Sequence, residues 1–178
     1  MERRAEPVLV VPYDTAWPAV FERLRARLAP VLGELAAGIE HVGSTAVLGL
    51  EARPIVDIDV VLRRIEDLDE AAARLAPLGY ERLGDLGIVG REAFRAGGLG
   101  PRHHLCVCAA GTTVLQAHLT LRDALRRDPD LAAKYGALKR ELAQLYRTDR
   151  DSYAEGKTAF ITAVLLDARG SRRRQRTK

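Results

Sequence analysis

The stretch HVGSTAVLGLEARPIVDIDVVL, residues 41–62, contains the features on which the predicted fold depends. Its second half, Pro54 to Leu62, is rich in Val and Ile and begins at a proline, which predicts a β-strand. Because successive side chains of a strand point to opposite faces, Asp57 and Asp59 share one face. Two neighbouring carboxylates repel each other and resist burial unless a cation neutralises them. Their hard oxygen atoms suit Mg²⁺ or Mn²⁺, so we expect a catalytic metal site at Asp57 and Asp59.

The first half of the stretch supplies a candidate phosphate-binding turn at Gly43-Ser44, which follows the short apolar segment 38–42. A glycine lets the backbone come close to a phosphate, and the Ser44 hydroxyl and nearby N–H groups can hold its oxygen atoms. A phosphate turn followed by a carboxylate pair predicts a site for a metal-bound nucleoside triphosphate. Taken separately, the two signals have simpler explanations, because an Asp-x-Asp strand also fits a solvated face and Gly-Ser is a common turn.

The combined pattern resembles the nucleotidyltransferase superfamily, which has the DNA polymerase β-like fold, and more closely the GrpB family. The similarity is carried by HVGSTAV at 41–47, by Gly49-Leu50 and by RPIVDIDV at 53–60. Further similar segments are VPYDTAWP at 11–18, RHHL at 102–105, 135–139 and 149–157, so the resemblance covers residues 8 to 168. It implies a nucleotidyltransferase-like fold, whereas most GrpB proteins have no assigned substrate.

Nucleotidyltransferases commonly carry a third carboxylate on the neighbouring strand, and this chain has no acid between Glu92 and Asp123. The segment 103–108 reads HHLCVC, and GrpB relatives resemble His-His-Leu-His there, so Cys106 replaces a histidine. His104 is the predicted substitute, because histidine is a competent metal ligand or general base near neutral pH. A structural histidine pair is the alternative, and Glu92 is a second candidate for the missing acid.

Three basic residues complete the predicted site. Arg53 stands where GrpB relatives usually carry a lysine, keeps the positive charge, and is expected to clamp phosphate at the mouth of the pocket. Lys139 and Lys157 lie on the C-terminal helices, which wall one side of the cleft in nucleotidyltransferase-like proteins. Lys157 is the stronger candidate for phosphate binding, and solvated surface lysines are the alternative for both.

The periodicity predicts an α+β fold, a small mixed sheet with packed helices and a C-terminal helical bundle. Residues 1–112 are expected to form the nucleotidyltransferase-like core, residues 113–170 the helical part of the same domain, and residues 171–178 a disordered basic tail. The expected helices begin near Asp14, Ile65, Thr113, Pro129 and Arg150, the last ending at Ala168. Besides 54–62, strands are expected at 80–83, 90–96 and 103–109.

Composition limits the other function classes. The 178 residues carry a net charge of +4, and the terminal segment 171–178 alone contributes four Arg and one Lys. The fold itself is therefore near neutral, which makes nucleic acid an unlikely partner. Cys106 and Cys108 are the two cysteines and lack the partners of a zinc site. Without a signal-like or membrane-length apolar segment, a cytoplasmic protein with no membrane contact is expected.

These features predict metal-dependent transfer of a nucleotidyl group from a nucleoside triphosphate to an unknown small acceptor. Two alternatives remain at this point. A catalytically degenerate fold would bind a nucleotide without turnover, as the missing third acid suggests. An interaction domain linked to coenzyme A metabolism is the other, because GrpB-like domains also occur fused to dephospho-CoA kinase.

Overall fold

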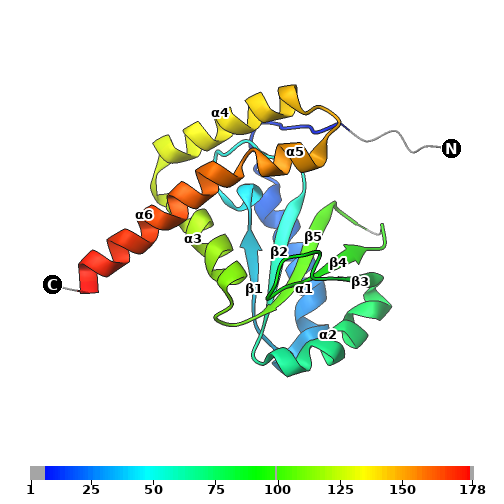
Figure 1. Ribbon diagram of the computed structural model, residues 1–178. Helices are drawn as coiled ribbons and strands as arrows, with labels where there is room; N and C mark the ends of the chain where they lie inside the picture. The colour runs from blue at the N-terminus through cyan, green and yellow to red at the C-terminus, as the bar shows by residue number, and fades with distance from the viewer. Residues whose placement is uncertain (1–6, 99, 177–178) are drawn as a thin grey trace.

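A mixed β-sheet with the strand order β1-β2-β5-β4-β3 forms the centre of the fold (Figure 1). The structure is a computed structural model that describes residues 7–98 and 100–176. Within these residues the strands are β1 (Ala36–Val42), β2 (Val56–Leu62), β3 (Tyr80–Gly84), β4 (Glu92–Ala96) and β5 (His103–Ala109). The pair β2 and β5 is parallel, while β1 with β2, β5 with β4 and β4 with β3 are antiparallel. The predicted α+β class and mixed sheet are confirmed.

The helices of the structure are α1 (Trp17–Leu32), α2 (Leu68–Leu75), α3 (Thr113–Arg127), α4 (Pro129–Leu145), α5 (Arg150–Glu155) and α6 (Thr158–Arg176). Short 3₁₀ turns flank α2 and follow α1, and another occupies Ser44–Ala46. The first helix therefore begins at Trp17 rather than near Asp14, whose carboxylate accepts a hydrogen bond of 2.8 Å from the Ala16 N–H in the preceding turn. Pro18 then lies in the first helical turn, where its missing N–H costs nothing.

The two faces of the sheet are covered differently. The apolar stripe of α1 and the buried residues of α2 pack on one face, together with Ile58, Val60, Leu105 and Val107. The other face carries Asp57, Asp59 and Cys106, and α3 covers its far part through Leu115, which packs on Val61 and Cys108. The strand alternation predicted from the sequence thus separates an apolar face from a face that bears the carboxylates.

The C-terminal region differs from the prediction in two places. The single expected helix from Arg150 to Ala168 is divided into α5 and α6, which Gly156 and Lys157 connect. The backbone of α6 continues helically to Arg176, past the expected end of the helix at Ala168. The last part of the expected disordered tail, residues 177–178, lies outside the described residues. In Figure 1, α4, α5 and α6 lie across one end of the sheet.

Candidate functional site

The turn after β1 depends on Gly43 for two physical reasons. Its φ of +69° is one that L-residues with a Cβ rarely adopt. A Cβ placed on Gly43 would also lie 2.2 Å from Oδ2 of Asp57, far inside any permitted contact. The backbone of the predicted phosphate turn therefore rests directly against the first carboxylate of the Asp pair.

His41 at the end of β1 stabilises the turn through a side-chain contact. A hydrogen bond of 3.0 Å joins its Nε2 to Oγ1 of Thr45, and its ring stacks on Phe21 at 4.7 Å between centroids. Burial, assisted by the positive charge of Arg126, lowers the pKa of His41 to about 4. The imidazole is thus neutral at physiological pH and acts as a structural support. From α3, Arg126 also donates to the Ala46 carbonyl at 2.9 Å.

Each of the two predicted carboxylates has a histidine partner. Nδ1 of His104 on β5 donates to Oδ1 of Asp57 at 2.8 Å, and Nδ1 of His118 on α3 donates to Oδ2 of Asp59 at 2.7 Å. The parallel register places His104 directly opposite Asp57 on the neighbouring strand. Asp59 is only 2% exposed, whereas Asp57 lines a pocket. We call these four residues the carboxylate wall.

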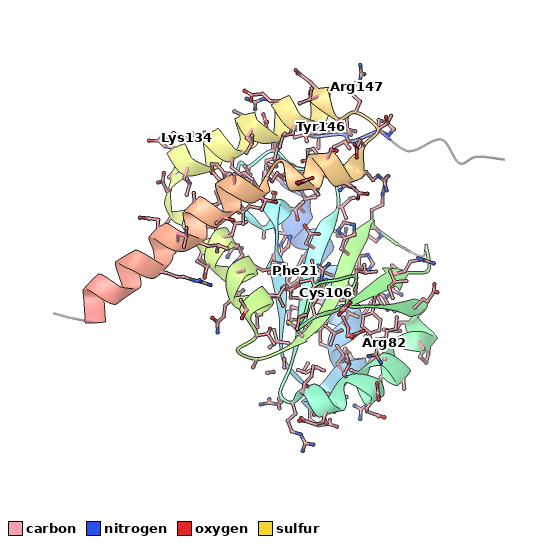
Figure 2. The ribbon with its side chains drawn as sticks, viewed as in Figure 1. Phe21, Arg82, Cys106, Lys134, Tyr146 and Arg147 are labelled. Atoms are coloured by element: carbon pink, nitrogen blue, oxygen red, sulfur yellow. The ribbon has the colours of Figure 1, made fainter. Side chains whose placement is uncertain are left out.

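The position opposite Asp59 is occupied by Cys106, on β5, the strand on which the resemblance led us to expect a third carboxylate. Burial raises the pKa of this thiol to about 11, so it is not a thiolate at neutral pH. Arg91 approaches its Sγ at 3.8 Å, and Arg91 Nε is buried without a hydrogen-bond partner among the described residues. Figure 2 shows Cys106 within the sheet.

The second candidate for the missing acid was wrong. Glu92 pairs in register with Val107, which faces the apolar core, so its side chain lies on the opposite face from the Asp pair. Its carboxylate instead accepts a hydrogen bond of 2.9 Å from Nε of Arg82 on β3. Figure 2 shows Arg82 on the α2 side of the molecule.

Arg53, Lys139 and Lys157 face the carboxylate wall across the pocket, and we call them the cationic wall. Lys139 of α4 is only 2% exposed. Its Nζ donates to the Glu51 carbonyl and lies 4.8 Å from the Tyr135 ring centroid. Burial, followed by the charge of Lys157, lowers the pKa of Lys139 to about 7.

Lys157 and Arg53 are half-buried cations, also with lowered pKa values. Nζ of Lys157 lies 4.5 Å from the ring centroid of Tyr153, and burial and the charge of Arg53 lower the pKa of this lysine. Burial and two neighbouring arginines likewise lower the pKa of Arg53. Within the described residues, no carboxylate forms an ion pair with any member of the cationic wall. The solvated surface lysines that the sequence left as an alternative are therefore not what the fold contains.

A pocket of about 180 Å³ separates the two walls. It brings together most of the predicted site residues: Ser44, Arg53, Asp57, His104, Lys139 and Lys157. Gly43 supports it from behind Asp57. Asp59 does not line the pocket, because α3 covers it and His118 occupies one of its oxygen atoms.

His118 is the site residue that sequence reasoning did not identify. The available signal was its spacing of four residues from Arg122, which places both side chains on one helix face. The structure uses that face to hold β1 and β2, because Arg122 Nη1 donates to Glu40 at 2.8 Å while His118 binds Asp59. The sequence showed the shared face but not the strands that it contacts.

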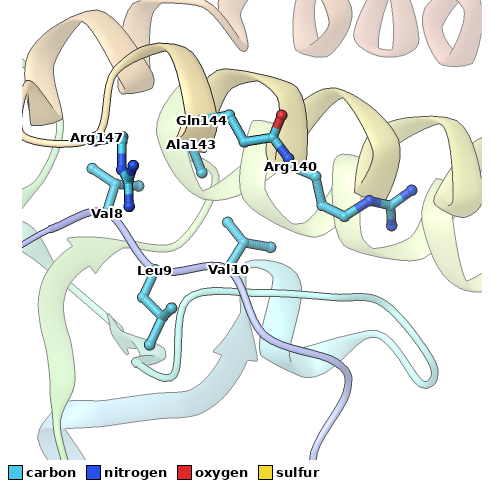
Figure 3. A pocket seen from close by; sticks show the side chains of 7 residues that line it. All are labelled: Val8, Leu9, Val10, Arg140, Ala143, Gln144 and Arg147. Atoms are coloured by element: carbon cyan, nitrogen blue, oxygen red, sulfur yellow. The ribbon is translucent and has the colours of Figure 1, made fainter.

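A separate hollow of about 380 Å³, away from this site, lies where the N-terminal segment crosses α4 (Figure 3). Val8, Leu9 and Val10 form one side, and Figure 3 shows Arg140, Ala143, Gln144 and Arg147 on the other. The described lining contains aliphatic groups, one amide and two arginines, and none of these described residues is an acid, a histidine or a cysteine. The pocket between the two walls is therefore the better candidate for a reaction.

The carboxylate wall offers a limited set of ligands to a divalent cation. Among the described residues, no three His, Cys, Asp or Glu side chains form a group that could hold a metal ion. Mg²⁺, however, is commonly held by one or two carboxylates together with substrate phosphates. Asp57, which lines the pocket, fits that second arrangement, in which the ion arrives with the triphosphate, whereas Asp59 lies on the same strand face but is buried and hydrogen-bonded to His118.

Comparison with known proteins gives a family match over most of the chain. A family model described as GrpB protein matches residues 7–166. The YqkA protein of Bacillus subtilis is 32% identical over 168 residues, which are 94% of this chain and 48% of that protein. A dephospho-CoA kinase of Mycolicibacterium paratuberculosis is 29% identical over 180 residues, with 87% of this chain and 44% of that protein covered. The chain thus spans about half the length of each of these relatives.

Two solved structures place the fold. The conserved protein GrpB from Enterococcus faecalis has a TM-score of 0.82 and 35% identity, with 90% of this chain and 96% of that chain covered. The Cid1 poly(U) polymerase bound to MgATP has a TM-score of 0.55 and 12% identity, covering 76% and 44%. This distant likeness shows a shared nucleotidyltransferase-like fold. Among the described residues, no helix combines the length and apolar character that crossing a membrane requires.

Proposed function

The chain is a member of the GrpB family, and we propose that it transfers a nucleotidyl group from a nucleoside triphosphate to a hydroxyl of a small acceptor. The observation that carries this proposal is the opposition of the two walls across one pocket. The carboxylate wall satisfies its own charges, whereas the cationic wall has no carboxylate partner among the described residues. Buried or half-buried cations without a carboxylate at ion-pair distance are costly, so an anionic ligand is the expected complement.

In this proposal the triphosphate lies between Ser44 and the cationic wall. The Ser44 hydroxyl and the N–H groups at the start of its 3₁₀ turn donate to phosphate oxygens, and Gly43 keeps the backbone close enough. Lys157 and Lys139 supply charge from the helical side, and Arg53 supplies a planar donor at the pocket mouth. Asp57 and Asp59 would hold Mg²⁺ (or Mn²⁺), which supplies charge neutralisation on the phosphates when bound.

His104 is suited to take the proton of the acceptor hydroxyl. Because its Nδ1–H donates to Asp57, its Nε2 is the ring atom that can accept this proton at the pocket. The same Asp–His arrangement orients general bases in other enzymes. Asp57 therefore positions the imidazole through Oδ1 while its other oxygen faces Gly43.

The decisive test is calorimetric titration of each nucleoside triphosphate, with and without Mg²⁺ or Mn²⁺, on the wild type, Asp57→Asn and Asp57→Asn/Asp59→Asn. We expect metal-dependent binding in the wild type and a loss of at least about 100-fold in the variants, the scale of losing a charged metal ligand. The matched control is Asp167→Asn, which changes an exposed carboxylate on α6. Unchanged binding by a folded Asp57→Asn variant would contradict the assignment.

A catalytically inactive nucleotide-binding domain is the second candidate. Two observations favour it: β5 carries no acidic residue beside the Asp pair, and His118 is hydrogen-bonded to Asp59. Under this alternative, metal-dependent binding would be seen but no pyrophosphate would form with any acceptor offered. A sensitive pyrophosphate assay on the same samples separates the two functions.

A third candidate is an interaction domain associated with coenzyme A metabolism. It is supported by the match to a dephospho-CoA kinase, in which the matching region makes up 44% of the protein. This alternative predicts a stoichiometric complex with a dephospho-CoA kinase and no affinity for nucleoside triphosphates. Size-exclusion chromatography of the mixed proteins, together with the titration above, distinguishes it from both nucleotide-binding functions.

A further inference from the structure

A second pocket, of about 360 Å³, adjoins the one between the two walls. Both are lined by Arg53, Ile55 and His104, so these residues form the border between the two spaces. The second pocket lies beside the ends of β4 and β5, and Phe94 and Leu83 contribute an apolar part of its lining. The His104 imidazole, which the proposed function uses as the base, is therefore accessible from both sides.

The lining of this second pocket is strongly basic. Four arginines and two histidines contribute to it: Arg53, Arg95, Arg102, Arg150, His103 and His104. Its described part contains no Asp or Glu. Arg95 pairs with Glu81 at 3.0 Å on the surface, an exposed contact that contributes little.

Arg53 shows how close these charges lie. Besides burial, the positive charges of Arg150 and Arg102 lower the pKa of Arg53. Both arginines also line the pocket beside Arg53, and planar guanidinium groups bind phosphate through paired N–H donors, so this part of the lining is a suitable site for a dianion.

We propose that this second pocket binds the acceptor of the nucleotidyl transfer, and that the acceptor carries a phosphate group. This inference rests on the proposed function for the role of the ligand. The phosphate would lie among Arg53, Arg102 and Arg150, and the acceptor hydroxyl would reach His104 at the border of the two pockets.

The step balances without a further reactant. The acceptor oxygen forms a bond to the α phosphorus of the triphosphate, and the bond from that phosphorus to the oxygen bridging to the β phosphorus breaks. Pyrophosphate leaves with the bonding electron pair, and the hydroxyl proton passes to Nε2 of His104. The donor triphosphate remains on the side of Ser44 and Lys157, opposite the acceptor.

The test is calorimetric titration without nucleotide, at fixed ionic strength, using glycerol 3-phosphate, glycerol and glycerate as probes. We expect glycerol 3-phosphate to bind and the Arg102→Gln/Arg150→Gln variant to bind it at least about tenfold more weakly, because two charged donors are removed. Arg25→Gln, which changes an exposed arginine of α1, should bind like the wild type. The single variants and thermal unfolding of every sample guard against misfolding.

Three outcomes would overturn the proposal. Glycerol 3-phosphate could fail to bind the wild type, bind the double variant unchanged, or bind no better than glycerate, which offers a carboxylate instead of a phosphate. Titration of the double variant with a magnesium nucleoside triphosphate keeps this test separate from that of the proposed function. Retained nucleotide binding with lost glycerol 3-phosphate binding supports two separate subsites, whereas parallel loss of both contradicts them.

Discussion

The two walls of the pocket have opposite electrostatic character. On the carboxylate wall each acid is matched to a histidine within 2.8 Å, and the strand register and α3 hold both partners in place. On the cationic wall the lysines lie over aromatic rings, and burial lowers their pKa values. The first wall is complete in the absence of a ligand, whereas the second carries an electrostatic cost that an anion would relieve.

The contrast separates charges that contribute to folding from charges that contribute to binding. A matched buried pair is costly to break, because its remaining member loses both water and partner. An unmatched buried charge is costly to keep, so its removal stabilises the fold and weakens the function. Substitutions in the two walls should therefore change the free energy of unfolding in opposite directions.

The largest effect is expected for His118→Ala, which leaves Asp59 buried without a partner. We expect it to lower the free energy of unfolding by about 3 kcal/mol. The matched control is His104→Ala, where the side chains of His104 and Asp57 are 58% and 38% exposed, so the loss should stay below about 1 kcal/mol. Urea denaturation of both variants gives the comparison, and equal losses would show that the two pairs are equivalent.

Gly43→Ala should disrupt the contact between the phosphate turn and the carboxylate wall. Its Cβ would displace Asp57, so we expect magnesium nucleotide affinity to fall by about 100-fold, a change of about 2.7 kcal/mol. Gly49→Ala is a close control, because it has a similar φ of +78° but open space around its Cβ. Urea denaturation should therefore show that both variants lose stability through backbone strain. Titration calorimetry should show that only Gly43→Ala loses magnesium nucleotide affinity.

The smallest effect, with the opposite sign, is expected for Lys139→Met. The unfolded chain keeps the Lys139 proton up to a pKa near 10.5, whereas the folded protein loses it near 7, so wild-type stability rises with pH across that interval. The methionine variant lacks this rise. It should be more stable than the wild type by about 1 kcal/mol at pH 6 and less stable at pH 9, because two pH units above the folded pKa add about 2.7 kcal/mol to wild-type stability.

Lys134→Met provides the control for this substitution. Lys134 is exposed on the same helix, and Figure 2 shows it on the outer side of α4. Its replacement should leave stability unchanged at both pH values. A Lys139→Met variant that is destabilised at pH 6 would mean that the contacts with Glu51 and Tyr135 outweigh the burial of the charge.

Much of the fold could be predicted because its signals are local. The strand of the Asp pair, the helix of Phe21, Leu24, Leu28 and Leu32, and the strand from His103 each show a clear apolar period. The division between α5 and α6 was missed, since a glycine inside a helical pattern does not by itself end a helix. The continuation of α6 beyond Ala168 was not predicted, because the polar, basic composition there carries no apolar helical period.

The site was predictable where one strand or turn defines it, and not where distant elements meet. Gly43, Asp57 and His104 follow from motif spacing and strand alternation. The pairing of Asp59 with His118 joins residues 59 positions apart through the docking of α3, which no local pattern encodes. The burial of Lys139 likewise depends on α4 packing against the loop at Glu51.

That contact between α4 and the loop at Glu51 also has a consequence for the order of assembly. Glu51 binds Lys139 through its carbonyl and Arg140 through its carboxylate, partners 88 and 89 residues away in sequence. During synthesis the strands are complete at residue 109, well before α4 leaves the ribosome. The strands that carry Asp57 and Asp59 are thus in place first. The pocket can retain an anion only after α4 has packed against the loop at Glu51, which closes a long stretch of chain.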